Sequence, residues 1–252
     1  ATDIEFKEFY PVLNGLTYFK GEKWTGQSIP VSVIIDADGH EICQFSNDGD
    51  TYYEIIGRAE DSFLVCAIRH TTSAPEIYLL TVDKNGKVTN DPCPIYNNSS
   101  EDDKNFWGDN SSVSVEAKYL GEGIYAIGNY RSDLFGFYNS NNATTQKVYI
   151  YDTWLSDIAE FVDGKTYLPH SGYFITIEEL QENRSNLVLT NEAILPNSWT
   201  AEDVIQIGPW LYNYTEIADL QGNIIRMPDD FEYPQLFPSS DEIGRASCRE
   251  RV

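Results

Sequence analysis

Short runs in which apolar and polar residues alternate fill most of the chain, and many are followed by an acidic residue and a glycine-containing turn. The pattern is clearest over residues 33–42, 80–88 and 217–225, where two such runs flank the turn. A two-residue period places alternate side chains on one face of a strand, and Asp-Gly or Asn-Gly supplies the positive φ that a tight hairpin turn needs. The sequence therefore predicts repeated antiparallel β-hairpins.

Further strand pairs are expected at residues 115–128, 134–151 and 166–177. The acidic residues that end successive strands lie on average about 46 residues apart, close to the length of one four-stranded propeller blade; they are Asp36, Asp83, Asp152, Glu178 and Asp219. Helix-like stretches are short, a turn or two at residues 155–161, 177–182 and 200–205. We expect an all-β fold of antiparallel hairpin repeats, arranged as a propeller-like or curled β-repeat array.

The last residues differ from the rest of the chain. Residues 243–252 hold three of the 17 basic side chains, and their sequence resembles the translation of a common sequencing adaptor. We therefore expect residues 1–241 to form an incomplete β-repeat domain and residues 242–252 to be a non-native tail, so the natural protein would continue beyond about Glu242. The tail is left out of the fold prediction, as an expression scar would be.

The net charge and the apolar content of the chain limit the classes of partner that it could bind. The chain has 40 acidic and 17 basic residues and a formal net charge of −23. A field of this sign repels phosphate backbones, which argues against nucleic acid as a partner. No apolar run approaches the length of a membrane-spanning helix, so no membrane insertion is expected. With 41% hydrophobic and 13% aromatic residues, the chain is too apolar to be disordered.

One stretch of the chain resembles a known family. Residues 158–166, followed by residues 171–177, match the second half of the unit found in WG-repeat (KWG-repeat) proteins, which are common in bacteria. Residues 120–125 form a looser copy, and residues 21–26 and 220–228 echo other parts of the unit. The resemblance implies a β-repeat fold with a binding role or no assigned function, and it implies no reaction.

The best candidate for a metal site is the turn Asp36–Gly39, whose Asp-x-Asp-Gly sequence is similar to a calcium loop. When Gly39 is aligned with the sixth loop position, Ile34 and Phe45 occupy positions one and twelve. Neither can supply the carboxylate that a helix-loop-helix calcium site requires. We expect the acidic residues to cap a tight turn instead, and we expect no metal and no cofactor.

The histidines and cysteines do not indicate a metal or redox site any more strongly than this turn does. His40, His70 and His170 are far apart in sequence, lie in or beside turns and lack metal-ligand spacing, so solvated turn residues are expected. The cysteines ahead of the tail lack the C-x-x-C spacing of a redox or metal pair; they are Cys43, Cys66 and Cys93. Whether any two of them form a disulfide is left open.

Three alternatives remain for function, and the third is a purely structural spacer in a longer protein. Aromatic residues beside loops could stack on a sugar or a peptide, or they could fill the core between sheets; the candidates are Phe106, Trp107, Trp210 and Tyr212. Asp152 and Glu178 could instead be the paired carboxylates of a propeller-type, glycan-active hydrolase. We favour a non-enzymatic module, extracytoplasmic or on the cell surface, that binds a protein or a glycan.

Overall fold

The computed structural model describes residues 4–225, apart from residues 11–13, 25, 27, 47–48, 70, 72–74, 98, 108–112, 131–132, 183–184 and 214. His70 and the tail at residues 242–252 therefore lie outside the described residues. Strands dominate the described part, and every strand pair within its sheets is antiparallel. The all-β prediction is confirmed.

The strands form five sheets, and within each sheet the strands are neighbours in chain order. The first sheet contains β1 (Ile4–Phe9), β2 (Leu16–Trp24), β3 (Ser28–Asp36) and β4 (Glu41–Ser46). The second contains β5 (Thr51–Arg58), β6 (Ser62–Arg69), β7 (Glu76–Asp83) and β8 (Cys93–Pro94). The third contains β9 (Val115–Gly121), β10 (Ile124–Asn129), β11 (Leu134–Asn139) and β12 (Thr144–Ile150).

The remaining sheets are smaller. The fourth contains β13 (Lys165–Leu168), β14 (Tyr173–Thr176) and β15 (Asn191–Glu192), and the fifth contains β16 (Ile205–Ile207), β17 (Trp210–Tyr212), β18 (Ile217–Asp219) and β19 (Ile224–Ile225). The described part also has four short helical segments. Three of them, α1 (Glu101–Trp107), η1 (Leu155–Asp157) and η2 (Ala201–Asp203), lie between sheets, and α2 (Ile177–Gln181) lies between β14 and β15. In the described part of the chain, no helix is long and apolar enough to cross a membrane.

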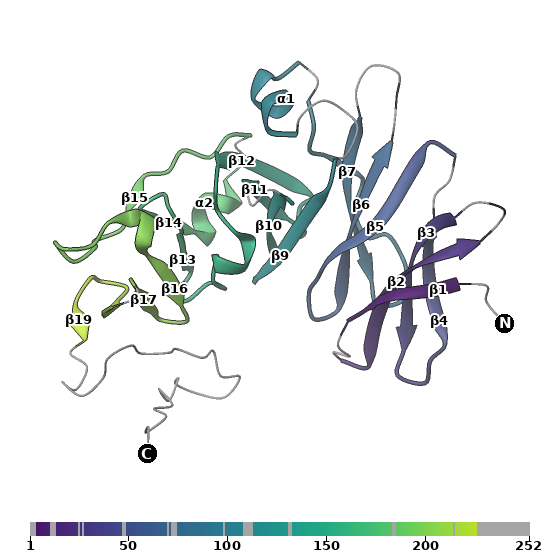
Figure 1. The fold of residues 1–252 in the computed structure, drawn as a ribbon, viewed down its shortest axis with the longest axis horizontal. Coiled ribbons are helices and arrows are strands. Elements are labelled where there is room, and N and C mark those ends of the chain that lie inside the picture. Colours follow the sequence, from purple (N-terminus) through teal and green to yellow (C-terminus); the bar gives the residue numbers. More distant parts are fainter. Residues whose placement is uncertain are drawn as a thin grey trace.

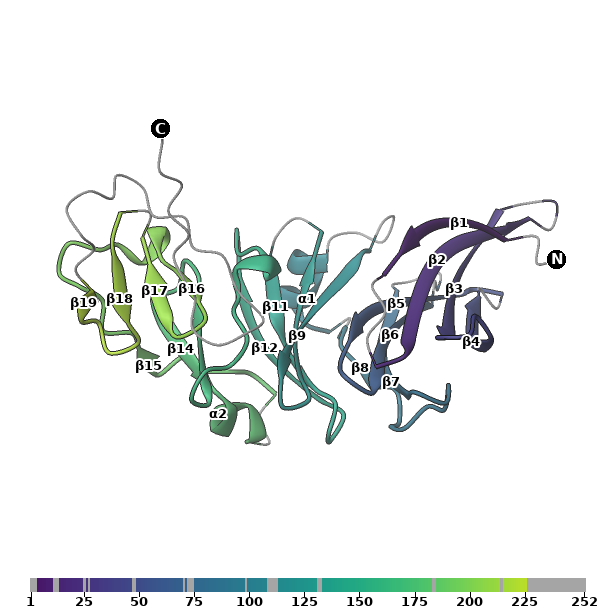
Figure 2. The same ribbon diagram turned by 90° about the horizontal axis from the view of Figure 1, so that it is seen from below.

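The sheets follow one another in a row, from the first at one end to the fifth at the other (Figures 1 and 2). Strand β6 shows how they are held together. Phe63, Val65 and Ala67 pack in a core with residues of the first sheet, whereas Leu64, Cys66 and Ile68 pack in a second core with residues of the third. Because both faces are covered, the strand is a continuous apolar run rather than an alternating one.

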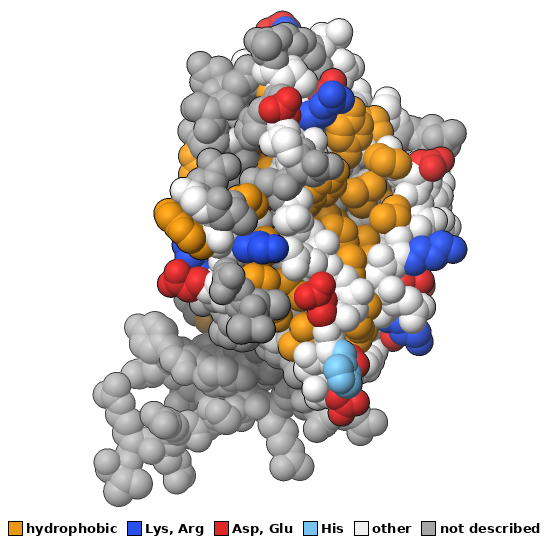
Figure 3. All heavy atoms as spheres, turned by 90° about the vertical axis from the view of Figure 1, so that its right-hand side faces the viewer, with side chains coloured by type: hydrophobic (Ala, Val, Ile, Leu, Met, Phe, Trp, Pro, Cys, Tyr) orange, Lys and Arg blue, Asp and Glu red, His pale blue; other side chains and the backbone are white. Residues whose placement is uncertain are grey.

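The same arrangement recurs further along the row. In β10, Ile124 and Ala126 join a core with the fourth sheet, whereas Tyr125 and Ile127 face the second. Tyr167 of β13 then packs in a core with residues of the fifth sheet. Four hydrophobic cores thus separate the five sheets. At the outer end of the row, a strip of hydrophobic side chains is visible on the first sheet, with charged side chains along its margins (Figure 3).

Three hairpin turns repeat the same local structure. Oδ1 of Asp36 accepts hydrogen bonds from the backbone N–H groups two and four residues later, and so does Oδ1 of Asp83 and of Asp219. The glycine three residues after each of these capping aspartates has φ between +80° and +83°. The predicted turn role of the acids and the positive φ of these glycines are both confirmed.

Helix α1 was not expected from the sequence. Its Asp103 is fully buried and accepts hydrogen bonds from Nζ of Lys147 at 2.6 and 2.9 Å, from the hydroxyl of Tyr149 and from the backbone N–H of Asn97. A buried carboxylate is tolerable only when it is paired and hydrogen-bonded in this way. The cluster fixes α1 against β12, which places Phe106 in the core between the second and third sheets.

Candidate functional site

The four aromatic residues singled out in the sequence do not come together. Phe106 and Trp107 are 4% and 7% exposed and pack at a tilt against Phe135, with ring centroids 5.4 and 5.1 Å from it. They belong to the core between the second and third sheets and offer no ring face to a ligand. Trp210 and Tyr212 are half-buried on β17 of the fifth sheet, so the suggestion that they contact a partner stays a prediction.

A different set of aromatic rings is open to solvent at one end of the third sheet. Tyr130, Tyr151 and Trp154 are 50%, 54% and 60% exposed. Tyr130 follows β10 and Tyr151 follows β12, and these strands run in the same direction because each is antiparallel to β11 between them. Both strands therefore finish at the same end of the sheet. We call the surface formed there by Tyr130, Tyr151 and Trp154 the aromatic edge.

Hydrogen bonds join the two segments that carry these rings. Oδ1 of Asp133, in the loop after β10, accepts a hydrogen bond from the backbone N–H of Asp152 at 3.0 Å. The backbone N–H of Asp133 is itself bonded to Oδ1 of Asn129, at 3.3 Å. Tyr130 and Tyr151 each lie next to a member of this network, and Trp154 lies two residues beyond Asp152.

The aromatic edge is also anchored to its neighbours. The fully buried Thr153 donates a hydrogen bond from Oγ1 to the carbonyl of Pro169, 3.3 Å away, in the turn between β13 and β14. The ring of Tyr151 lies 6.3 Å from that of Phe106, so the buried Phe106 supports an exposed ring. A scaffold that orders exposed rings before a ligand arrives reduces the entropy lost on binding.

Two residues at this edge have unusual backbone angles. Asp152 has φ +56° and His170, in the turn after β13, has φ +64°. Aspartate and histidine tolerate the left-handed region better than most residues, but a non-glycine residue is uncommon there. Such conformations persist where the surrounding structure fixes them, and they concentrate at functional sites. Five other non-glycine residues of the described chain also have positive φ, among them Asn14, Glu122 and Asp163, so these two angles mark tight turns.

The structure does not bring Asp152 and Glu178 together. The amide of Gln146, near the start of β12, donates to the carbonyl of Glu179 in α2 at 3.0 Å, which places α2 beside that end of the strand. Asp152 lies six residues further on, beyond the other end of β12, a separation of roughly 20 Å at about 3.3 Å per residue. The carboxylates of a glycosidase lie about 5–10 Å apart, so this pair does not have the required geometry.

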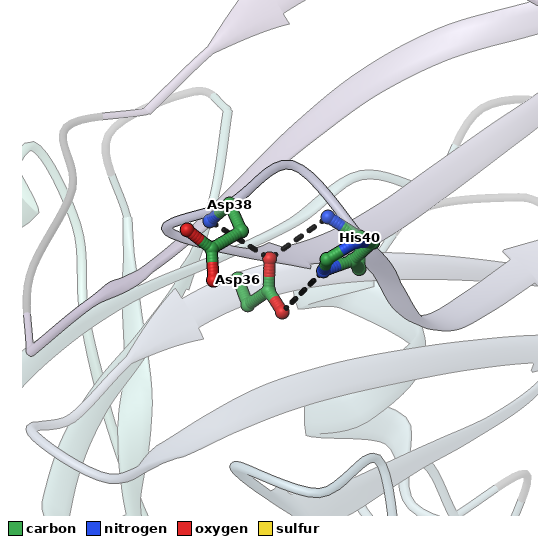
Figure 4. A group of neighbouring side chains, drawn as sticks. All are labelled: Asp36, Asp38 and His40. Atoms are coloured by element: carbon green, nitrogen blue, oxygen red, sulfur yellow. Dashed lines mark hydrogen bonds and ion pairs between the residues drawn. The ribbon is translucent and has the colours of Figure 1, made fainter.

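The cluster of Asp36, Asp38 and His40 has ligand atoms within 4.8 Å of one another (Figure 4). The hydrogen bonds of the turn explain why these three side chains lie so close together. The carboxylate of Asp36 accepts from the backbone N–H groups of Asp38 and His40 and lies 3.2 Å from Nδ1 of His40. These bonds, above all the one from the His40 backbone, lower the pKa of Asp36. The carboxylate is used to close the turn.

The described cysteines are free thiols. Burial raises the pKa of Cys66, Cys93 and Cys43 above the ordinary value for a thiol. A raised pKa lowers the thiolate fraction, which is the reactive form. Cys66 and Cys93 are buried and Cys43 is half-buried, so all three pack as small apolar side chains.

No protein-family model matches the chain. The likeness to WG-repeat proteins therefore stays a prediction.

Proposed function

We propose that the protein is a non-catalytic binding module and that its ligand, a glycan or a protein, docks on the aromatic edge. The observation that carries this proposal is the gathering of Tyr130, Tyr151 and Trp154 at one edge, each at least half exposed. A group of exposed apolar side chains is typical of a binding surface, whereas a single exposed ring needs no explanation. Their flat faces bury a large area while losing little side-chain entropy.

The charge of the chain limits the class of ligand. The net charge is −23, and Asp133 and Asp152 lie beside the exposed rings. Anionic ligands would be repelled at long range, whereas neutral sugars can stack on the rings and cationic groups can also interact with ring faces. A neutral glycan or a basic peptide fits the aromatic edge best.

The wider architecture proposed from the sequence is a propeller-like β-repeat array of the WG-repeat kind. Two observations support it: four of the five sheets have four strands in chain order, and consecutive sheets pack face to face through apolar cores. Both are features of propeller blades. Such arrays present ligands with strand-end loops, which agrees with the position of the aromatic edge. An extracytoplasmic or cell-surface location is part of the same proposal.

The experiment compares Tyr151→Ala and Trp154→Ala with Trp24→Ala, using an immobilised panel of neutral oligosaccharides and basic peptides. Trp24 is the matched control because it is 69% exposed but lies on the first sheet. The loss of one stacking ring, worth about 1.4 kcal/mol, should weaken binding about tenfold. Trp24→Ala should leave the affinity unchanged.

All three variants should keep the melting temperature of the parent, because exposed side chains contribute little to stability. Equal loss of binding in all three would contradict the proposal, as would unchanged binding in the first two. Failure of the parent protein to bind any member of the panel would exclude neutral glycans and basic peptides as its ligands.

A further inference from the structure

An exposed carboxylate, that of Asp152, stands in the chain between two rings of the aromatic edge, those of Tyr151 and Trp154. The backbone around it is fixed, because the N–H of Asp152 is bonded to Oδ1 of Asp133 and the next residue, Thr153, is fully buried. Within the described part of the chain, no hydrogen bond or ion pair joins the carboxylate of Asp152 to another residue.

This carboxylate differs from those of the aspartates that end other strands. In Asp36, Asp83 and Asp219, Oδ1 accepts hydrogen bonds from two backbone N–H groups of its own turn. The turn after β12 is built in another way, with Leu155 instead of a glycine three residues after Asp152. The carboxylate of Asp152 is therefore left for a group from outside the chain.

A second acidic side chain lies close to the same rings. Glu116 is exposed and pairs with Gly128 across β9 and β10, at the end of the sheet that carries the aromatic edge. A Cβ added at Gly128 would lie 3.2 Å from Cδ2 of Leu155, which directly follows Trp154. Glu116 therefore stands beside the segment that carries the most exposed ring of the edge.

Two basic residues belong to the same surroundings. Nζ of Lys118 donates a hydrogen bond to the carbonyl of Ser156, 2.7 Å away. The carboxylates of Asp157 and Glu160 act on the same ammonium group, so its charge is balanced within the protein. Arg131 belongs to the loop after β10 and lies outside the described residues. Its single charge does not cancel the acidic residues of the edge, in a chain whose net charge is −23.

We propose, on the basis of the binding role inferred above, that the aromatic edge takes a basic segment of a partner protein. An arginine or lysine side chain of that segment pairs with Asp152 and lies against the exposed rings. A cation is attracted both by a carboxylate and by an aromatic face, and a guanidinium group can also lie flat on a ring. A neutral glycan is the competing ligand, but it would leave the carboxylate without an opposite charge.

The test uses two end-capped peptides of the same shape, one of four arginines and one of four citrullines, together with cellotetraose as a neutral glycan. Citrulline keeps the planar end group of arginine without its charge, so the pair separates charge from stacking. Calorimetric titration is done at about 0.15 M salt, where attraction at long range is screened. The arginine peptide should bind about tenfold more tightly than the citrulline peptide.

Asp152→Asn removes the charge and keeps a side chain that tolerates the left-handed backbone. It should weaken binding of the arginine peptide about fivefold and leave binding of the citrulline peptide unchanged. Asp163→Asn is the matched control, because Asp163 is also exposed and has φ +50°, against +56° at Asp152, but lies in a different turn, before β13. The control should bind the arginine peptide as the parent does.

Equal affinity of the parent for the two peptides would overturn the proposal, and so would tighter binding of cellotetraose or no binding of the arginine peptide. Equal weakening in Asp152→Asn and Asp163→Asn would also overturn it, because the peptide would then respond to net charge alone. Unchanged affinity in Asp152→Asn with weaker binding in Tyr151→Ala would reject the ion pair and keep the aromatic edge as the site. Unchanged affinity in both Tyr151→Ala and Trp154→Ala would reject the site itself.

Discussion

Replacing Trp107 with alanine should destabilise the protein strongly. The side chain is 7% exposed, and its ring centroid lies 4.9 Å from that of Phe106 and 5.1 Å from that of Phe135. Removing a buried ring of this size loses its transfer free energy and leaves a cavity, together about 3–5 kcal/mol. In a chain of this length, each kcal/mol lowers the melting temperature by about 2–4 °C, so a fall of roughly 6–20 °C is expected.

The matched variant is Trp154→Ala, which removes the same side chain from a position that is 60% exposed. It should change the free energy of unfolding by less than about 0.5 kcal/mol. Thermal unfolding followed by circular dichroism, together with urea titration, measures both variants. Equal melting temperatures for Trp107→Ala and the parent would refute the placement of this ring in the core between the second and third sheets. A large fall for Trp154→Ala would refute the exposure of the aromatic edge.

Three further outcomes can be measured by the same methods. Gly222→Ala should destabilise the fold clearly more than Gly39→Ala. Both glycines have positive φ, but of the two only Gly222 lies where a new Cβ would meet a backbone oxygen, that of Ile194, at 2.2 Å. Equal losses of stability in the two variants would contradict this geometry. Asp103→Asn should cost about 3–5 kcal/mol, because the ammonium group of Lys147 loses its buried counter-charge; a near-neutral change would show that the pair is not buried. Hydrogen bonds lower the pKa of the capping aspartates Asp36, Asp83 and Asp219. The stability that these bonds contribute is therefore present above about pH 4, the pKa of an unfolded aspartate, and is lost as the pH falls below it. A variant with all three aspartates changed to asparagine should be less stable at pH 7 and less sensitive to acid, and an unchanged acid sensitivity would contradict the assignment.

The strands and their turns could be predicted because the signals are local. A two-residue alternation and an aspartate three residues before a glycine act within one hairpin, as at Asp36 and Gly39. Helix α1 could not be predicted in this way. It is held by the contact of Asp103 with Lys147, 44 residues away, and no local pattern indicates that pair.

The sequence could predict the residue type of the candidate site, aromatic residues beside loops, but not which of these residues form it. The sequence left open whether the aromatic residues beside loops would face a ligand or fill the core, because a ring next to a loop can point either way. Phe106 and Trp107 turn inward because α1 is fixed against β12, whereas Tyr151 and Trp154 follow the end of β12 and stay in solvent. The separation of Asp152 and Glu178 also depends on the direction in which successive strands run, which residue spacing does not encode.

The most direct test of the binding role is to follow the indole N–H resonances of the five tryptophans while the best-binding oligosaccharide or basic peptide of the panel is titrated into the protein. The account predicts that the Trp154 resonance shifts in proportion to bound ligand, while the resonances of Trp24 and of the buried Trp107 and Trp199 stay in place. Saturable binding that leaves Trp154 unmoved, or that shifts Trp24 instead, would contradict the assignment of the aromatic edge as the ligand site.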